Sequence, residues 1–351
     1  MTGGVYRKMQ NIISSKKCFL IAEIGVNHNG DIELAKNMIF AAKDSGADAV
    51  KFQTFKAEIL ASKLTPKVKY QIDNTASRES HFQMLEKLEL SYEDHFSLKA
   101  YCDSLNIEFI STPYDVNSAI FLNDDLNVKI FKTASADIVD IPLQEYIAST
   151  RKNAIVSVGM SSLSEIEKVC DIYYKNKNKN LTLLHCVSNY PCSDKSLNLK
   201  VIKTLQKAFG VPVGYSDHCI GETGAIISIA FGAQIIEKHF TLDKNLPGPD
   251  HLASCTPDEF RNYADTIRRA EIMLGSYIKR CQPEELEMSK VSRKSLHLSK
   301  DKNKGDVLSE DDFQLMRPGT GFKYDKKEFL VGRVLKKDLK KGHLIEFSDF
   351  L

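Results

Sequence analysis

The stretch VPVGYSDHCIGETGAIISIAFGAQIIEKHF, residues 211–240, shows how this chain is built. It begins and ends with short apolar runs, VPVGYSD (211–217) and AQIIEKHF (233–240), and the residues between them, GETGAIISIAFG, have a helix-like pattern. Both runs are continuous rather than alternating, which is typical of strands that are covered on both faces. The stretch therefore predicts a strand, a helix and a second strand, which is the repeating unit of a parallel sheet.

The same unit repeats along the first 280 residues. Six more apolar runs, most of them rich in β-branched residues, come before this stretch: CFLIAEIG (18–25), DAVKFQT (48–54), IEFISTP (107–113), VKIFKTAS (128–135), AIVSVGM (154–160) and LTLLHCV (181–187). Helix-like stretches separate them; in SLSEIEK we expect Ser164 to cap the helix, with Glu167 completing a capping box. Eight strands alternating with helices predict an α/β fold of the (β/α)8 TIM-barrel type. A doubly wound open sheet is the alternative, and it is disfavoured because neither GxGxxG nor GxxxxGK[ST] follows the first strand.

The pattern changes after residue 280. We expect a barrel domain at 1–280, a charged, helix-poor linker at 281–292 and a small β-rich domain at 293–351. Within the last part, SLHLS, EFLVGRVL and HLIEF have strand-like composition, and the segments DKNKGDVLSEDDF and KDLKKGHLIEFSDF are similar to each other. The connection at 55–90 is long, polar and poorly periodic, so we expect it to lie over the active-site face of the barrel.

Composition excludes several classes of partner. The 48 Lys and Arg residues nearly balance 46 Asp and Glu residues, a net charge of +2, which gives no electrostatic reason for a nucleic-acid or membrane partner. No apolar run is as long as a membrane span, and no secretory signal precedes the first predicted strand. The eight cysteines are scattered and form no CxxC pair, so we expect reduced thiols in a cytoplasmic protein.

Polar residues gather where the predicted strands end. In a (β/α)8 barrel the chemistry takes place at the carboxyl ends of the strands. All eight predicted strands carry polar residues near that end: Glu23, Asn27, His28 and Asn29; Lys51 and Gln53; Ser111, Thr112 and Asp115; Lys132 and Ser135; Ser157; His185, Ser188, Asn189 and Tyr190; Ser216, Asp217 and His218; Glu237, Lys238 and His239. Each alone has a structural explanation: the lysines as barrel ion pairs, His185 as a core histidine, Asp217 and Glu237 as partners of the lysines. Their repetition at one end favours a site, because buried strands exclude unpaired polar groups.

Two of these histidines indicate a metal ion. His218 and His239 end neighbouring strands, which lie about 5 Å apart in a sheet. Two imidazoles at the same level, with oxygen donors beside them, suit a divalent ion such as Mn²⁺ or Zn²⁺. Lys51 and Lys132 suit a phosphate or a carboxylate. Together these residues predict an anionic substrate beside a Lewis acid.

At this point the chain resembles a known family, the sialic acid synthases. These enzymes make nine-carbon nonulosonic acids from phosphoenolpyruvate (PEP) and an N-acetylamino sugar. The matching motifs follow the family order over nearly the whole chain: IAEIGVNHNGDIELAKNMI, GADAVKFQTFKAE, EFISTPYD, FKTASADIVDIPL, VSVGMSSLSEIE, LLHCVSNYP, VGYSDHCIGETGAIISIAFGAQIIEKHFTLDKNLPGPDHLAS and LMRPGTGF. The resemblance implies a TIM barrel followed by an antifreeze-like (SAF-type) domain, in a domain-swapped homodimer.

The resemblance also implies roles for individual residues. Glu23, Lys51 and Lys132 match catalytic positions. The residues that match the PEP site are Lys51, Lys132, Ser135, Ser157 and Ser216. Those that match positions facing the sugar are Gln53, Ser188, Tyr190, Asp250 and Arg317. The resemblance implies that Arg317, in the small domain of one subunit, contacts the sugar bound in the other subunit. His218 and His239 match the ligands of a divalent metal, with Mn²⁺ preferred and Mg²⁺ or Co²⁺ as alternatives.

Three positions depart from the pattern of many N-acetylneuraminate synthases. Ser188, in HCVSNYP, stands where many have Asn, and the chain reads FQTF after the second strand where some read HQTH. Both differences favour the legionaminic branch, whose sugars carry a second acetamido group and lack a hydroxyl, over N-acetylmannosamine. Ser135-Ala136 replaces the family's Ser-Gly.

Two other functions stay open at this stage. A Schiff-base aldolase on the same barrel would use Lys132 or Lys51 as its nucleophile. A non-catalytic carbohydrate-binding protein would use the small β-rich domain as its working part.

Overall fold

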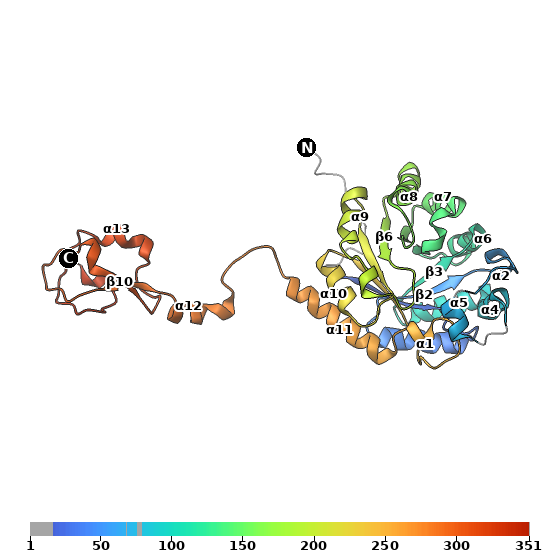
Figure 1. Ribbon diagram of the computed structural model, residues 1–351, viewed down its shortest axis with the longest axis horizontal. Coiled ribbons are helices and arrows are strands. Elements are labelled where there is room, and N and C mark those ends of the chain that lie inside the picture. The colour runs from blue at the N-terminus through green and yellow to red at the C-terminus, as the bar shows by residue number, and fades with distance from the viewer. Residues whose placement is uncertain (1–16, 68, 76–78, 351) are drawn as a thin grey trace. The chain divides into compact units, whose positions relative to one another are not determined.

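The structure, a computed structural model, describes residues 17–67, 69–75 and 79–350. Eight parallel strands form a closed barrel in sequence order, and β1 pairs with β8 to close it (Figure 1). The strands are β1 (Phe19–Gly25), β2 (Ala49–Thr54), β3 (Glu108–Pro113), β4 (Ile130–Thr133), β5 (Asn153–Ser157), β6 (Leu181–Cys186), β7 (Val213–Asp217) and β8 (Ile235–His239). The predicted (β/α)8 barrel is confirmed.

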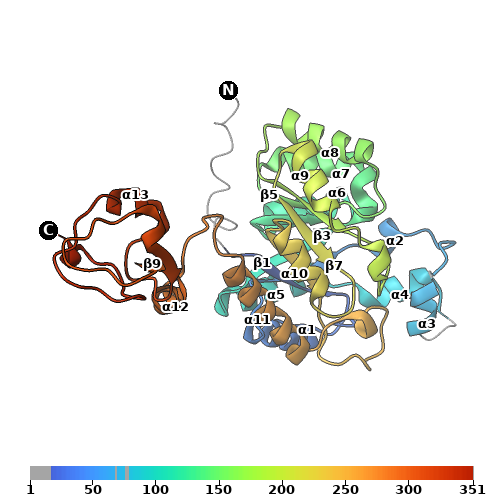
Figure 2. The same ribbon diagram turned by 60° about the vertical axis from the view of Figure 1, so that its left-hand side comes forward.

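Helices surround the strands, as Figures 1 and 2 show from two directions. The main ones are α1 (Ile32–Asp44), α5 (Tyr92–Ser104), α6 (Val116–Ile120), α7 (Ile141–Thr150), α8 (Leu163–Lys175), α9 (Val201–Phe209), α10 (Thr223–Ala230) and α11 (Pro257–Leu274). A π-helical segment (Phe121–Asp125) continues α6, and 3₁₀ turns lie at Ser135–Val139, Asp194–Ser196 and His251–Ala253. Among the described residues, no helix is both long and apolar enough to cross a membrane.

The barrel interior has an apolar layer that sets the floor of the functional site. Its members are buried and pack against one another: Ile21, Ala49, Ile110, Ile130, Ile155, Leu184 and Ile235. Six of the seven lie two residues before a polar residue of the same strand, as Ile21 does before Glu23, and Leu184 lies two residues before Cys186. Because side chains alternate between faces with a period of two, the polar residues form the next layer inside the barrel.

The start of α8 differs from the prediction. Ser162, in extended backbone, is the N-cap; it accepts a hydrogen bond from the Glu165 amide, and the Glu165 carboxylate accepts from the Ser162 amide. The predicted cap at Ser164 with Glu167 is therefore wrong. The helix begins at Leu163, so Ser164 already has helical backbone and cannot serve as the cap.

The long second connection is partly helical rather than a loop. It contains α2 (Ala57–Leu60), α3 (Lys69–Asn74) and α4 (His81–Leu88). On its inner face α4 buries Met84, Leu85 and Leu88 in a cluster with Val26 and Phe55. A capping box between Ser80 and Gln83 starts the helix. Burial of that apolar face places α4 over the carboxyl end of the barrel.

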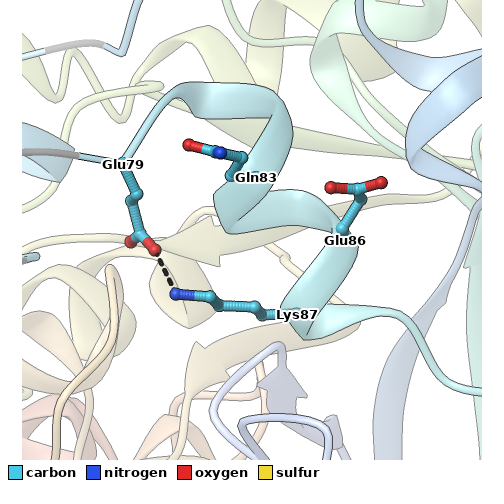
Figure 3. Close-up of a pocket in the computed structure, with 4 residues that line it drawn as sticks. All are labelled: Glu79, Gln83, Glu86 and Lys87. Atoms are coloured by element: carbon cyan, nitrogen blue, oxygen red, sulfur yellow. Dashed lines mark hydrogen bonds and ion pairs between the residues drawn. The ribbon is translucent and has the colours of Figure 1, made fainter.

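The outer face of α4 is polar. Figure 3 shows a pocket there that is lined by Glu79, Gln83, Glu86 and Lys87, with an ion pair of 2.7 Å between Glu79 and Lys87. Glu79 also pairs with Lys67 at 3.3 Å. The two lysines, Lys87 first, lower the pKa of Glu79 against the opposing effect of burial. Surface pairs of this kind contribute about 0–1 kcal/mol each, so they support α4 rather than build a second site.

Residues 276–351 form a second compact unit, separate from 1–275. Its elements are a 3₁₀ turn (Pro283–Glu285), α12 (Leu286–Ser292), β9 (Ser295–Leu298), β10 (Phe313–Met316) and α13 (Lys327–Leu330), and β9 pairs antiparallel with β10. Residues 286–292 are helical where the sequence indicates a helix-poor linker, because Pro283 and a capping box at Gln282 start a turn that α12 continues. The strand predicted in EFLVGRVL is also wrong at 328–330, which lie in the helical turn α13, and Leu330 is buried there.

The two similar segments of this unit have equivalent structures. Asp312 and Asp349, 37 residues apart, each have a fully buried side chain and close a 3₁₀ turn, at Glu310–Asp312 and at Phe347–Asp349. Each accepts a hydrogen bond from the backbone amide three residues before it, at 2.8 Å in both cases. The observed turns confirm the similarity seen in the sequence.

Backbone hydrogen bonds follow the same 37-residue spacing. The Ser299 amide donates to the Asp312 carbonyl, and the Lys336 amide donates to the Asp349 carbonyl. Lys302 and Leu339, also 37 residues apart, donate to each other's carbonyl oxygens. A reciprocal pair of this kind lies on the axis of an internal two-fold repeat. The small unit is thus two interlocked copies of one motif around an apolar core that includes Leu298.

Candidate active site

A cavity of about 770 Å³ opens at the carboxyl end of the barrel. Every strand contributes at least one lining side chain: Glu23, Lys51, Gln53, Thr112, Lys132, Ser157, Cys186, Ser216, Glu237 and His239. The loops add Ser135, Ser188, Tyr190, His218 and Asp250, and α4 adds Met84, Leu85 and Leu88. The structure therefore brings all the predicted site residues of the first unit to one cavity.

Two lysines and two glutamates form the floor of this cavity. Lys51 Nζ lies 2.7 Å from Glu23 Oε2 and 3.8 Å from Glu237 Oε1. Lys132 Nζ lies 3.7 Å from the same Glu237 oxygen and donates to Ser157 Oγ at 2.6 Å. All four charged side chains are buried. A buried array with two positive and two negative groups is neutral overall until an anionic ligand enters.

Burial and the attraction between opposite charges shift the pKa values of the two glutamates in opposite directions, and likewise those of the two lysines. Burial raises the pKa of Glu23; Lys51 opposes this and Glu237 reinforces it. For Glu237, Lys132 and then Lys51 overcome the effect of burial and lower the pKa. Burial lowers the pKa of Lys132, whereas Glu23 and Glu237 outweigh burial and raise that of Lys51. Glu237 is therefore the fixed anion of the array, and Glu23 is the carboxylate that can exchange a proton.

The two predicted metal ligands face each other. The rings of His218 and His239 have centroids 5.5 Å apart, and the Tyr190 ring lies 4.1 Å from His218. Burial lowers the pKa of His218 to about 4 and holds that of His239 well below its usual value, so both rings are neutral at pH 7. His218 Nδ1 donates to the Val187 carbonyl at 2.8 Å, so the neutral ring carries its lone pair on Nε2, and Ser216 Oγ lies 3.3 Å from that atom.

These residues fit a divalent metal only in part. Among the described residues the buried Nδ1 of His239 has no hydrogen-bond partner, which suits a ring nitrogen that binds a ligand. Across the residues that the structure describes, no group of three or more His, Cys, Asp or Glu side chains could hold a metal ion. A metal ion at the two histidines would therefore depend on water and substrate oxygens for its other ligands.

Small polar groups line the wall near Lys132. Ser135 Oγ accepts a hydrogen bond from the Gly159 amide at 3.0 Å and lies 3.0 Å from Cys186 Sγ. A Cβ atom at Gly159 would lie 2.5 Å from Ser188 Oγ. Only glycine leaves room for these side chains, which converge beside an ammonium group, a combination suited to phosphate oxygens.

The residues expected to face the sugar lie at the mouth, with one exception. Gln53 donates weakly to Glu23 at 3.5 Å, and Asp250 follows a loop whose Pro249 carbonyl accepts from Asn74 of α3 at 2.8 Å. Burial raises the pKa of Asp250 to about 6, against the opposing effect of Lys51. Arg317 belongs to the second unit, directly after β10, so its predicted role stays a prediction.

Several strand-end polar residues are not among those lining the cavity. Ser111 hydrogen-bonds Thr54, His185 hydrogen-bonds the Leu197 carbonyl, and Asp115 caps α6. Others that do not line it are Asn27, His28, Asn29, Asp217 and Lys238. Ser111, His185, Asp217 and Lys238 each adjoin a lining residue in their own strand, so the alternation of strand side chains directs them to the opposite face.

The apolar wall of the cavity was not predicted from the sequence. Met84, Leu85 and Leu88 lie in a segment that seemed poorly periodic. The capping box at Ser80 and Gln83 followed by HFQMLEKL was the available signal. Cys186, which adjoins the predicted residues of the sixth strand, was also missed.

Comparison with known proteins identifies the family. A model of the NeuB family matches residues 38–279, and a model of the SAF domain matches residues 293–351. The chain belongs to the NeuB family. The resemblance proposed from the sequence is thereby confirmed.

Relatives within the NeuB family narrow the chemistry. The chain is 46% identical to the N,N'-diacetyllegionaminic acid synthase of Legionella pneumophila, over 94% of this chain and 93% of that protein. It is 43% identical to the N,N'-diacetyllegionaminic acid synthase of Campylobacter jejuni, over 94% of this chain and 99% of that protein. Among solved structures, the N-acetylneuraminic acid synthetase of Leptospira borgpetersenii is similar, with a TM-score of 0.68 and 35% identity, over 78% of this chain and 90% of that one.

The protein is therefore an enzyme, a nonulosonic acid synthase, and the non-catalytic alternative is wrong.

Proposed function

We propose that this enzyme condenses PEP with a 2,4-diacetamido-trideoxy-mannose and water, giving N,N'-diacetyllegionaminic acid and phosphate. The observation that supports it is the cavity floor, where Lys51 and Lys132 flank Glu237 beneath two neutral imidazoles. Two buried lysines match the phosphate and carboxylate of PEP, and the imidazoles match a metal ion that accepts substrate oxygens. The choice of sugar follows the two synthases from Legionella and Campylobacter.

The lysines and serines would bind and orient PEP. Lys51 and Lys132 neutralise its phosphate and carboxylate, while the hydroxyl groups of Ser135, Ser157 and Ser216 donate to its oxygens. A divalent metal ion, Mn²⁺ in our proposal, would be held by His218 and His239 and would supply Lewis-acid polarisation of the sugar aldehyde. Holding PEP and the sugar at one floor gives the rate advantage of proximity.

Glu23 would position and deprotonate the water that adds to PEP. C3 of PEP forms a bond to the aldehyde carbon of the open-chain sugar while the π bond of the aldehyde breaks, so positive charge develops at C2 and negative charge on the aldehyde oxygen. Glu23 positions the water that adds at C2 and takes its proton, a role suited to its raised pKa. The proton taken by Glu23 passes to the aldehyde oxygen, which becomes a hydroxyl group. The C2–O bond to phosphate then breaks, and phosphate leaves with the bonding electron pair and takes up the proton that the C2 hydroxyl loses as C2 becomes a carbonyl. Water labelled with ¹⁸O tests this order, because label found in phosphate would show that the P–O bond breaks instead.

The small domain would complete the site from another subunit. We propose a homodimer in which Arg317 of each chain contacts the sugar bound by its partner. Light scattering would measure the oligomeric state. Equal mixing of Arg317→Ala and Lys51→Met chains would restore one intact site per mixed dimer, whereas no recovery of activity would count against the exchange.

A direct assay tests the substrates. The full chain is given PEP and Mn²⁺ with either N-acetylmannosamine or the 2,4-diacetamido-trideoxy sugar, and phosphate release is followed. We expect faster release with the diacetamido sugar; faster release with N-acetylmannosamine would assign the protein to the neuraminate branch, and release with neither would refute the proposal. Borohydride should trap no substrate on Lys132, whose ammonium donates to Ser157 and Thr133; trapping would favour the Schiff-base aldolase.

A further inference from the structure

A buried ion pair lies directly behind the two imidazoles. Asp217 and Lys238 are register partners in β7 and β8, one residue before His218 and His239. Both are almost fully buried, and neither lines the cavity. They face the helix layer, where Tyr263 of α11 donates to Asp217 Oδ2 at 2.7 Å.

Each group of the pair has several partners. Lys238 Nζ lies 3.2 Å from Asp217 Oδ2, and the Tyr215 hydroxyl donates to Asp217 Oδ1 at 3.2 Å. The Cys219 amide donates to Asp217 Oδ1 at 3.0 Å, while Lys238 Nζ donates to the Cys219 carbonyl. The Lys238 ammonium also lies 5.4 Å from the centroid of the Tyr263 ring. The pair therefore ties the end of β8 to the backbone on both sides of His218.

The two histidines depend on this backbone in different ways. His218 has a second constraint, the hydrogen bond from its ring to the Val187 carbonyl. The Nδ1 atom of His239 has no such partner among the described residues, so its ring orientation follows from the position of the β8 backbone and from ring contacts. We propose that Asp217 and Lys238 are positioning residues, which hold the two imidazoles at the separation needed to share one divalent cation.

Stability alone gives little reason for such a pair. Replacement of a buried ion pair by uncharged residues of similar volume is often neutral or stabilising. Removal of one partner, in contrast, leaves an unpaired buried charge. The double variant Asp217→Asn/Lys238→Met removes both charges and keeps the side-chain volumes close, so it separates folding from positioning.

Metal affinity provides a readout that does not depend on turnover. The dissociation constant for Mn²⁺ alone is measured by electron paramagnetic resonance on the full chain, and the visible spectrum of bound Co²⁺ reports ligand geometry. Loss of residues that orient metal ligands typically weakens metal binding about 10- to 100-fold. We expect at least a tenfold weakening in the folded double variant and a changed Co²⁺ spectrum.

The control is a more exposed ion pair at the opposite end of the barrel. Arg268 and Asp48 pair at 2.8 Å, just before β2. The variant Asp48→Asn/Arg268→Met should lower thermal stability and leave the Mn²⁺ affinity unchanged. An equal loss of Mn²⁺ affinity in this control would show that general loosening of the barrel is responsible and would overturn the inference.

A milder variant keeps the test decisive if the double variant does not fold. Tyr263→Phe removes one hydrogen bond to Asp217 and should weaken Mn²⁺ binding about threefold, in proportion to the loss of one buried contact. Unchanged Mn²⁺ affinity in the folded variants would overturn the positioning role. This inference rests on the proposed metal site. Wild-type protein that binds no Mn²⁺ would refute both the metal site and the positioning role. Wild-type protein that binds Mn²⁺, with the same affinity in the variants, would refute the positioning role alone.

Discussion

A methyl group at position 159 should disable the site without straining the backbone. Gly159 follows β5, and its φ lies outside the left-handed region that favours glycine. The Cβ of alanine would lie 2.5 Å from Ser188 Oγ, 2.6 Å from Cys186 Sγ and 2.9 Å from Ser135 Oγ. Ordinary separations are about 3.5–4.0 Å. The three side chains must therefore move by up to roughly 1 Å from the positions that they hold in the cavity wall.

The size of the effect follows from this displacement. Ser135 accepts the amide hydrogen of Gly159, so it cannot move without weakening that bond. A misplacement of about 1 Å costs roughly 10²-fold in rate. At about 1.36 kcal/mol per factor of ten, kcat/KM falls by the equivalent of about 2.7 kcal/mol. The folded state should lose about 1–3 kcal/mol, the usual cost of overpacking, and still fold, because natural proteins are typically stable by about 5–15 kcal/mol.

The assay compares Gly159→Ala with a matched control. In Gly214→Ala the new Cβ would lie 2.5 Å from the Ile235 carbonyl oxygen and 2.6 Å from Leu184 Cδ2, in the apolar layer below the cavity. Urea unfolding should show at least as much destabilisation of Gly214→Ala, whose new Cβ meets a backbone oxygen, and phosphate release should show a large loss only for Gly159→Ala. If Gly159→Ala turns over PEP as fast as the wild type, the predicted convergence of Ser135 and Ser188 on the substrates is wrong.

Three further outcomes are expected. Lys51→Met leaves Glu23 and Glu237 without their shared cation and should lower the free energy of unfolding by about 3–5 kcal/mol at pH 8. The pKa of Glu23, already raised to about 7, rises further, so the folded state retains a proton that the unfolded chain loses. Urea unfolding should therefore show a loss of stability relative to wild type that grows as pH rises above 7. Asp312→Asn should destabilise the small unit by about 2–4 kcal/mol, because it loses charge-assisted hydrogen bonds. The pKa of Asp312 is lowered in the fold, so the stability difference between variant and wild type should shrink as pH falls toward 2. Hydrogen exchange measures this difference, and a difference that does not change with pH would contradict the prediction. In thermal unfolding, Ser162→Ala should lower stability by about 1 kcal/mol and Ser164→Ala by much less, because Ser162 is the N-cap of α8. A larger loss for Ser164→Ala would show that Ser164 is the cap after all.

Composition and spacing were sufficient to predict the barrel and most of the site. Eight apolar runs with polar ends fit only a few architectures, and in a closed parallel barrel those ends meet on one rim. For this reason the sequence alone predicts that Lys51, Lys132, His218 and His239 meet in one cavity, and the structure places them there. The repeat around Asp312 was also visible as a recurring pattern of letters.

Only the tertiary structure decided which strand-end residues face the cavity. Both faces of a barrel strand are buried, one against the interior and the other against the helices, so apolar composition does not show which alternate set points inward. Glu237 and Lys238 are adjacent and both charged, yet one binds the two lysines of the floor and the other pairs with Asp217 behind it. That division, and the apolar wall that α4 adds, arise from contacts between segments far apart in the chain, which local sequence does not encode.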